Sequence, residues 1–182
     1  MARARCLADV LELGARRAGA DRLREIAAAQ GASLPEPGRL QRAAHGLVLA
    51  VRPDRWLLLL PPAAGGRAAA QWQERTAGCA FTVELSAGFR GLFVSGPAAR
   101  EVLRRGCRLD LADGHFPPGS AAATIIAQLA VIIAALPRGL LLLTAASTAR
   151  HFEEWLRATA QPFGLADAAD VTVASVCGES PT

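Results

Sequence analysis

The sequence predicts an α+β fold in which antiparallel or mixed sheets pack against helices. Strand-like apolar runs come in pairs separated by short turns, and stretches with helical spacing of apolar residues lie between the pairs. Two strands between successive helices favour antiparallel pairing over the parallel pairing that a crossover helix produces. A chain of 182 residues with 52% hydrophobic residues is large and apolar enough to fold around a core.

Helices and hairpins are expected in alternation, a rhythm that suggests an internal structural duplication. The helices are expected over residues 16–30, 67–76, 97–105 and 147–160. The hairpins are expected over residues 46–60, 80–95 and 124–144. Residues 1–15 carry mixed charges and no capping signal, so we expect a poorly ordered leader there. A single domain over 16–164 follows, and the small-residue, acidic tail (165–182) is expected to become ordered only against a partner.

Turn and terminus residues mark the ends of these elements. Pro97 suits the first turn of a helix, Gly106 suits the position after its end, and Ser147 can cap the last helix. The most apolar stretch, residues 125–143, approaches the length of a membrane span, but Pro-Arg-Gly interrupts it. We therefore expect two buried strands, TIIAQLAVII and LLLLT, around a turn, and no membrane association.

The composition excludes several classes of enzyme. All 20 basic residues are arginine. Without lysine the chain cannot form a Schiff base with pyridoxal phosphate or a carbonyl substrate, and it cannot supply a P-loop lysine. Without tyrosine it has no phenolic acid or base.

The basic residues do not indicate a nucleic-acid site. The net charge is +4, and four arginines follow one another on or just after a predicted helix, namely Arg100, Arg104, Arg105 and Arg108. Such a run can meet phosphate or an acidic protein, but it usually forms a solvated helix face. Aromatic residues are not interleaved with it, so binding to single-stranded nucleic acid is not expected.

The thiols and histidines predict neither a metal site nor a nucleophile pair. The four cysteines form no CxxC pair and the N-terminus lacks a signal-peptide pattern, which indicates free thiols in the cytoplasm. Zinc ligands usually occur at short spacings, and His45, His115 and His151 do not. Cys107 could pair with His115, but it follows a helix C-terminus, where the dipole disfavours a thiolate.

Two other candidate sites have simpler readings. Ser95–Pro97 leads from a strand into a helix and could bind an anion, but without a glycine-rich cradle it is better explained as a plain turn. Glu153 and Glu154 are adjacent on a helix and point in different directions, so they form no acid and base pair. The residues alone therefore identify no active site.

One region carries a more specific pattern than these motifs. The segment LSAGFRGLFVSGPAAREVLRRGCRLDL (85–111) is followed by HFPPGSAAATIIAQLAVII (115–133). With its LSxG, SGPxAxxVL, GCxLDL and FPPG motifs in this order, the chain resembles the gamma subunit of heterotetrameric sarcosine oxidase. PDRWLLLLPP (53–62) and HFEEWL (151–156) extend the likeness, which covers about residues 46–164.

Twelve residues, here called the motif residues, carry this resemblance and are candidates for a subunit interface. They are Ser95, Gly96, Pro97, Arg100, Arg104, Gly106, Cys107, Leu109, Asp110, Phe116, Pro117 and Gly119. The resemblance assigns none of them a catalytic, cofactor-binding or metal-binding role. It implies the α+β fold of the folate-binding domain of glycine-cleavage T-protein.

The resemblance also implies partners and cofactors. In such a complex a beta subunit carries FAD and oxidises the N-methyl amine, and an alpha subunit binds NAD and tetrahydrofolate. FMN lies between these two subunits, and a small delta subunit binds zinc. The gamma subunit carries no cofactor, so this chain is expected to be a structural, non-catalytic partner of alpha, beta and delta.

The sequence departs from the family pattern at three positions. Ala87, Ala121 and Ala123 stand where the family often has Asp, Cys and Gln. Sarcosine, N-methylglutamate and other secondary or tertiary amines therefore remain open as substrates of the complex. The alternative from another class is a stand-alone folate-binding, aminomethyltransferase-like protein. Such enzymes use a catalytic Asp early in the chain, and Asp9 and Asp21 lie in no comparable motif.

Overall fold

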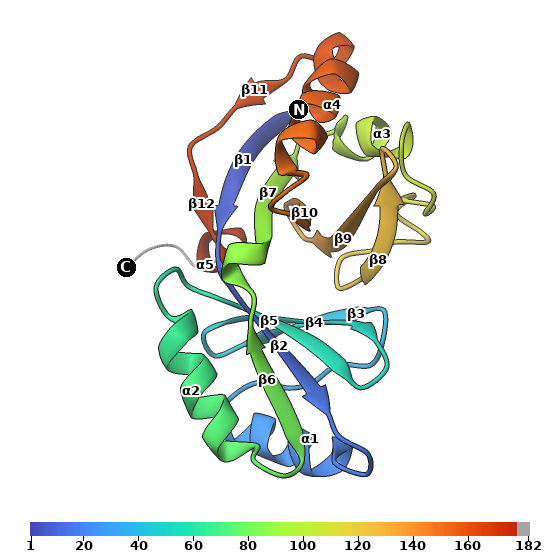
Figure 1. The fold of residues 1–182 in the computed structure, drawn as a ribbon. Coiled ribbons are helices and arrows are strands. Elements are labelled where there is room, and N and C mark those ends of the chain that lie inside the picture. The colour runs from blue at the N-terminus through green and yellow to red at the C-terminus, as the bar shows by residue number, and fades with distance from the viewer. Residues whose placement is uncertain (178–182) are drawn as a thin grey trace. The chain divides into compact units, whose positions relative to one another are not determined.

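The chain forms two compact units, each built on one sheet. The computed structural model describes residues 1–177. Unit 1 consists of Met1–Leu7 and Ala87–Val171, and unit 2 consists of Ala8–Ser86 and, of the described residues, those from Thr172 to Cys177. The chain thus gives its first strand to unit 1, builds most of unit 2, and then returns to complete unit 1 (Figure 1).

Unit 2 contains a five-stranded antiparallel sheet in the order β3-β4-β5-β2-β6. Its strands are β2 (Asp9–Ala15), β3 (Arg39–Ala43), β4 (Gly46–Arg52), β5 (Arg55–Leu60) and β6 (Ala80–Glu84). Its helices are α1 (Ala20–Ala29), α2 (Gly65–Arg75) and the short α5 (Val173–Val176). Leu23 of α1 and Trp72 of α2 pack in one buried cluster with Leu58 of β5, so both helices cover the same face of the sheet.

Unit 1 contains a seven-stranded mixed sheet in the order β11-β1-β7-β10-β9-β8, with β12 beside β1. Its strands are β1 (Ala2–Leu7), β7 (Phe89–Ser95), β8 (Ala121–Ile126), β9 (Leu129–Leu136), β10 (Gly139–Ala145), β11 (Ala166–Asp167) and β12 (Val171–Thr172). Its helices are α3 (Ala99–Arg104) and α4 (Ala149–Ala160). Val102 of α3 and Phe152 of α4 pack with Ile133 of β9, so these helices also share one face of their sheet.

Both units repeat one chain order, namely a strand, a helix, three antiparallel strands and a second helix. The series is β2-α1-β3-β4-β5-α2 in unit 2 and β7-α3-β8-β9-β10-α4 in unit 1. In each series the last strand of the three pairs with the first strand of the series. The suggested duplication is therefore present in the topology, although its repeat is this six-element series rather than an alternation of hairpins and helices.

The predicted α+β class with antiparallel or mixed sheets is confirmed. Most ladders are antiparallel, and β1 pairs in parallel with β11. The hairpin expected over 46–60 is formed by β4 and β5, and β9 and β10 pair around the Pro137 turn. The four expected helices correspond to α1, α2, α3 and α4, although α4 begins after Thr148 and Ser147 does not cap it.

The prediction of a poorly ordered leader over residues 1–15 is wrong. β1 pairs with β7 and β2 pairs with β5 and β6, so both strands lie inside sheets. Their partners are distant in sequence, with Ala2 opposite Ser95 and Val10 opposite Leu59. Such pairing leaves no signal in the local sequence, which is why mixed charge was misleading here.

Two predicted strand arrangements also differ from the structure. The hairpin over 80–95 does not form, because β6 pairs with β2 in unit 2 whereas β7 pairs with β1 and β10 in unit 1. The predicted strand TIIAQLAVII is interrupted at Ala127 and Gln128, which have φ values of 52° and 64°. Two successive residues with positive φ make a tight turn between antiparallel strands, so this segment forms β8 and β9.

The domain limits differ as well. The segment 16–164 is divided between the two units instead of forming a single domain. Within the expected tail, β11 and β12 pair with β1, so residues 166–172 are ordered by this chain itself. Val173–Val176 of the same tail form α5, and residues 178–182 lie outside the described residues.

Candidate functional site

The motif residues all belong to unit 1, on the segment from the end of β7 to the start of β8. Ser95 ends β7 and pairs with Ala2 of β1. Gly96 follows with a φ of 93°, a conformation that favours glycine, and lets the chain turn toward α3. Pro97 is exposed in this turn. The SGP motif is thus explained by the chain reversal that it makes.

Arg100 on α3 holds the loop that follows the helix. Its Nη1 donates to the backbone carbonyl oxygens of Leu111, at 2.7 Å, and Phe116, at 3.0 Å. Its Nε lies 2.8 Å from Oδ1 of Asp113. Because these acceptors come from three points of one loop, a single guanidinium fixes the shape of residues 111–116.

Asp110 organises the start of the same loop. Its carboxylate accepts a hydrogen bond from the backbone N–H of Ala112 at 2.9 Å and also contacts Nδ1 of His115. The Ala112 N–H, followed by the His115 ring, holds the pKa of Asp110 below its usual value. The carboxylate is therefore ionised at neutral pH and acts as a turn-forming acceptor.

Gly106 and Cys107 are packed tightly between α3, α4 and the end of β8. A Cβ on Gly106 would lie 2.5 Å from Cζ2 of Trp155, so only glycine fits without displacement. The backbone of Cys107 forms an isolated antiparallel β-bridge with that of Ile126, and the Cys107 Sγ lies 3.9 Å from Oγ1 of Thr124. The GC pair of the GCxLDL motif thus closes α3 against the sheet.

The remaining motif residues support the same segment. Phe116 is buried in the core of unit 1, and Leu109 packs against that core. Gly119 has a φ of 93°, and its N–H donates to the carbonyl oxygen of Ala135 at 2.9 Å. Pro117 is half-buried beside it. Arg104 points to solvent, with Glu101 at 3.9 Å as a weak ionic neighbour.

The catalytic arrangements considered from the sequence are not brought together. Cys107 contacts Thr124, whereas His115 contacts Asp110. No group of three or more potential metal ligands occurs among residues 1–177. No helix in this described part of the chain is long and apolar enough to cross a membrane. The polar contacts that the motif segment makes within the chain are hydrogen bonds and ion pairs.

Sequence reasoning missed a charged cluster centred on Arg3. Arg3 is 8% exposed, and its Nη1 donates to Oε2 of Glu153 at 2.6 Å. Its Nε and Nη2 donate to Oδ1 of Asp167 at 2.8 and 2.6 Å. The two acids are distant from Arg3 in the sequence, so no local pattern could have revealed this cluster.

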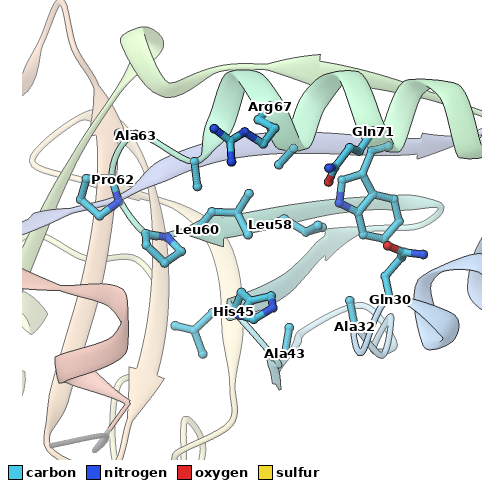
Figure 2. A pocket seen from close by; sticks show the side chains of 15 residues that line it. Gln30, Ala32, Ala43, His45, Leu58, Leu60, Pro62, Ala63, Arg67 and Gln71 are labelled. Carbon is cyan, nitrogen blue, oxygen red and sulfur yellow. The ribbon is translucent and has the colours of Figure 1, made fainter. Parts of the chain in front are cut away.

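Sequence reasoning also missed a cavity of about 470 Å³ in unit 2. Figure 2 shows Arg67 and Gln71 on its α2 side, with Leu58 and Leu60 on the sheet between them and the opposite wall. The opposite wall carries four labelled residues, namely Gln30, Ala32, Ala43 and His45. The lining residues come from four segments of the chain, namely 30–32, 43–47, 58–64 and 67–72, and share no spacing that would identify them.

Comparisons with known proteins give one consistent family. The family described as "Sarcosine oxidase, gamma subunit family" matches residues 16–161. A curated relative, the sarcosine oxidase subunit gamma of an Arthrobacter species, is 37% identical over 113 residues. This alignment covers 59% of the present chain and 54% of the relative, so it spans about half the length of the relative.

Two solved structures share the fold over nearly the whole chain. A chain of the heterotetrameric sarcosine oxidase from Corynebacterium sp. U-96, solved in complex with pyrrole 2-carboxylate, superposes with a TM-score of 0.79 at 27% identity. That match covers 92% of this chain and 87% of the other. Glycine cleavage system aminomethyltransferase T from Bartonella henselae superposes with a TM-score of 0.70 at 14% identity, covering 92% of this chain and 47% of that chain. The second likeness concerns the fold alone.

Proposed function

This chain belongs to the sarcosine oxidase gamma subunit family, and we propose that it is a non-catalytic assembly subunit of a sarcosine-oxidase-like flavoenzyme complex. The complex would oxidatively demethylate sarcosine or a related N-methyl amine. The chain would contribute a rigid surface to larger subunits and leave the chemistry to them.

The observation that carries this proposal is the way the motif residues are used. The guanidinium of Arg100 donates hydrogen bonds to the carbonyl oxygens of Leu111 and Phe116 and pairs with the carboxylate of Asp113. Asp110 is engaged with Ala112 and His115. Polar groups that are satisfied within one loop are suited to shaping a surface, whereas a catalytic group must reach a substrate.

The proposal places the cofactors and the other contacts outside this chain. FAD, FMN, NAD, tetrahydrofolate and zinc would be held by the alpha, beta and delta subunits, which are the proposed partners. The shaped loop and the exposed Arg104 would face one of them, since arginine is frequent at protein interfaces. The complex would work in the cytoplasm, without nucleic acid or membrane as a partner.

A second candidate is a stand-alone folate-binding, aminomethyltransferase-like protein. The similarity in fold to aminomethyltransferase T favours it, because that match covers 92% of this chain. A shared fold does not by itself specify a shared reaction. Saturable binding of tetrahydrofolate by the isolated chain would support this candidate over the assembly role.

Affinity purification of the tagged full chain from its native host tests the assembly role. The expected product is a yellow complex that contains two larger chains and one smaller chain, identified by mass spectrometry and by flavin absorbance. A matched purification with an unrelated tagged protein controls for flavoproteins that bind the resin. A colourless chain of 19.0 kDa recovered alone would reject the proposal.

A further inference from the structure

The cavity of unit 2 has an apolar floor that the fold holds in place. Leu58 is 2% exposed and Leu60 is half-buried, and both line the cavity from one face of β5. Trp72 completes the floor from α2 and belongs to the buried core of the unit. Because these side chains are packed from below, the floor is preformed.

Four polar side chains surround this floor without satisfying one another. Arg67 and Gln71 are four residues apart on α2 and therefore lie on the same side of the helix (Figure 2). Gln30 follows α1, and His45 precedes β4. In the part of the chain that the structure describes, none of the four side chains forms a hydrogen bond or ion pair with another residue. Their donors and acceptors are available to a ligand.

The charge of the cavity has one sign. Among residues 1–177, its lining contains Arg67 and no Asp or Glu. The nearby carboxylate of Asp9 accepts the N–H of Gly65 at 2.7 Å and so is engaged at the start of α2. Arg67 therefore keeps its full positive charge beside an apolar surface, an arrangement that attracts a carboxylate through paired N–H donors.

We propose that this cavity binds a small molecule that has an apolar body and one carboxylate group. The apolar body packs on Leu58, Leu60 and Trp72, and the carboxylate accepts hydrogen bonds from Arg67. The volume of about 470 Å³ lies in the range of small-molecule sites. The proposal does not depend on the assembly role, because the lining residues belong to unit 2 and the motif residues belong to unit 1.

Naphthalene-2-carboxylate is a suitable probe, and its neutral carboxamide is the matched ligand control. Each is titrated into the full chain, with calorimetry and tryptophan fluorescence as readouts. Arg67→Gln removes the charge from the cavity. Arg75→Gln removes an arginine whose side chain also forms no hydrogen bond or ion pair among residues 1–177; it lies on the same helix but outside the lining, so it is the control variant.

The wild-type chain and Arg75→Gln should bind the carboxylate at one site with the same Kd. Arg67→Gln should bind it at least about tenfold more weakly, the usual effect of losing a hydrogen bond to a charged group. The carboxamide should bind weakly and equally to all three. Ala68→Leu, which narrows the cavity, should also weaken binding while the circular dichroism spectrum stays unchanged.

Three outcomes would overturn the proposal. The first is no saturable binding by the folded chain, and the second is equal weakening by Arg67→Gln and Arg75→Gln, which would indicate a general charge effect. The third combines two results: the isolated chain does not bind the probe, and the other subunits of the complex slow hydrogen exchange over residues 65–75. That result would make the cavity a subunit contact and would leave the assembly role intact.

Discussion

Arg3 and Asp167 lie 164 positions apart in the chain and are joined by two hydrogen bonds to one oxygen atom, Oδ1 of Asp167. The bonds measure 2.8 Å from Nε and 2.6 Å from Nη2. The backbone supports the same contact, because Arg3 of β1 lies opposite Asp167 of β11 in a parallel pair. Strands β1 and β11 of unit 1 are thus held together by one arginine, which also binds Glu153 of α4.

Replacing Arg3 with Met should lower the free energy of unfolding by about 2 kcal/mol, because it removes a nearly buried cation from two carboxylates. Arg5→Met is the matched control on the same strand. Arg5 pairs with Asp170 on the surface, with 67% and 36% of the side chains exposed, and such pairs contribute little. Urea denaturation of both variants measures the difference, and equal losses would show that Arg3 has no special role.

The acid stability of the chain should depend on Asp167. The hydrogen bond from Arg3, helped by the charges of Arg3 and Arg157, holds the pKa of Asp167 below its usual value. The stabilisation is therefore complete above the unfolded-state pKa, which is about 3.9, and is lost as the pH falls through the lower folded-state pKa. Asp167→Asn should be less stable at neutral pH and should lose less stability on acidification. The free energy of unfolding is measured by urea denaturation at several pH values. If it fell equally with pH in the wild type and in Asp167→Asn, this prediction would be contradicted.

Loss of the Arg100 side chain should loosen the loop that carries the motif residues. Arg100→Met leaves the carbonyl oxygens of Leu111 and Phe116 without their donor, so we expect a loss of about 2 kcal/mol and faster hydrogen exchange over residues 108–119. Arg104→Met, on the same helix and facing solvent, should change neither quantity. Unchanged exchange in Arg100→Met would mean that other contacts hold the loop.

Gly106→Ala should destabilise the chain by about 1 to 3 kcal/mol because the added methyl group meets Trp155 and the backbone nitrogen of Ala127. Gly114→Ala is the control, since nothing lies within 4 Å of the added group there. Thermal unfolding compares the two variants. A Gly106→Ala variant as stable as Gly114→Ala would show that Trp155 can move aside at little cost.

Local features of the sequence were sufficient for the helices and for two hairpins. In the first hairpin Arg52 pairs with Arg55 across the turn, and Asp54 within the turn has a φ of 55°. Because the connection between these two apolar strands is so short, they lie side by side in the sheet, and the sequence pattern and the structure agree.

Non-local pairing explains the errors at the N-terminus. In β1 the side chain of Arg3 is buried together with Ala4 and Cys6, so the strand lacks the usual alternation of apolar and polar residues. A buried arginine is tolerated because Glu153 and Asp167 neutralise it, and these acids come from the far end of the chain. The division of TIIAQLAVII into two strands was missed for a different reason. Its turn is formed by Ala127 and Gln128, and neither is one of the usual turn residues such as Gly or Asn.

Contacts between residues that are distant in sequence also limited the prediction of the candidate sites. The motif residues were found through their resemblance to a family, and the structure explains them by contacts such as that between Arg100 and the loop backbone. The cavity in unit 2 could not be found in this way. Arg67 and His45 are separated in sequence and are brought to one cavity only when α2 packs on the face of the sheet.

The assembly role is tested most directly by the turnover per bound flavin of the complex, purified with the wild-type chain or with Arg100→Met and assayed with sarcosine and other N-methyl amines. If the chain only assembles the complex, Arg100→Met should lower the yield of complex while the turnover per flavin stays the same, and Arg104→Met should alter the turnover no more than Arg100→Met does. A complex that forms in full yield with Arg100→Met but turns over more slowly per flavin would contradict the assembly role, because it would place this loop in contact with the reacting groups.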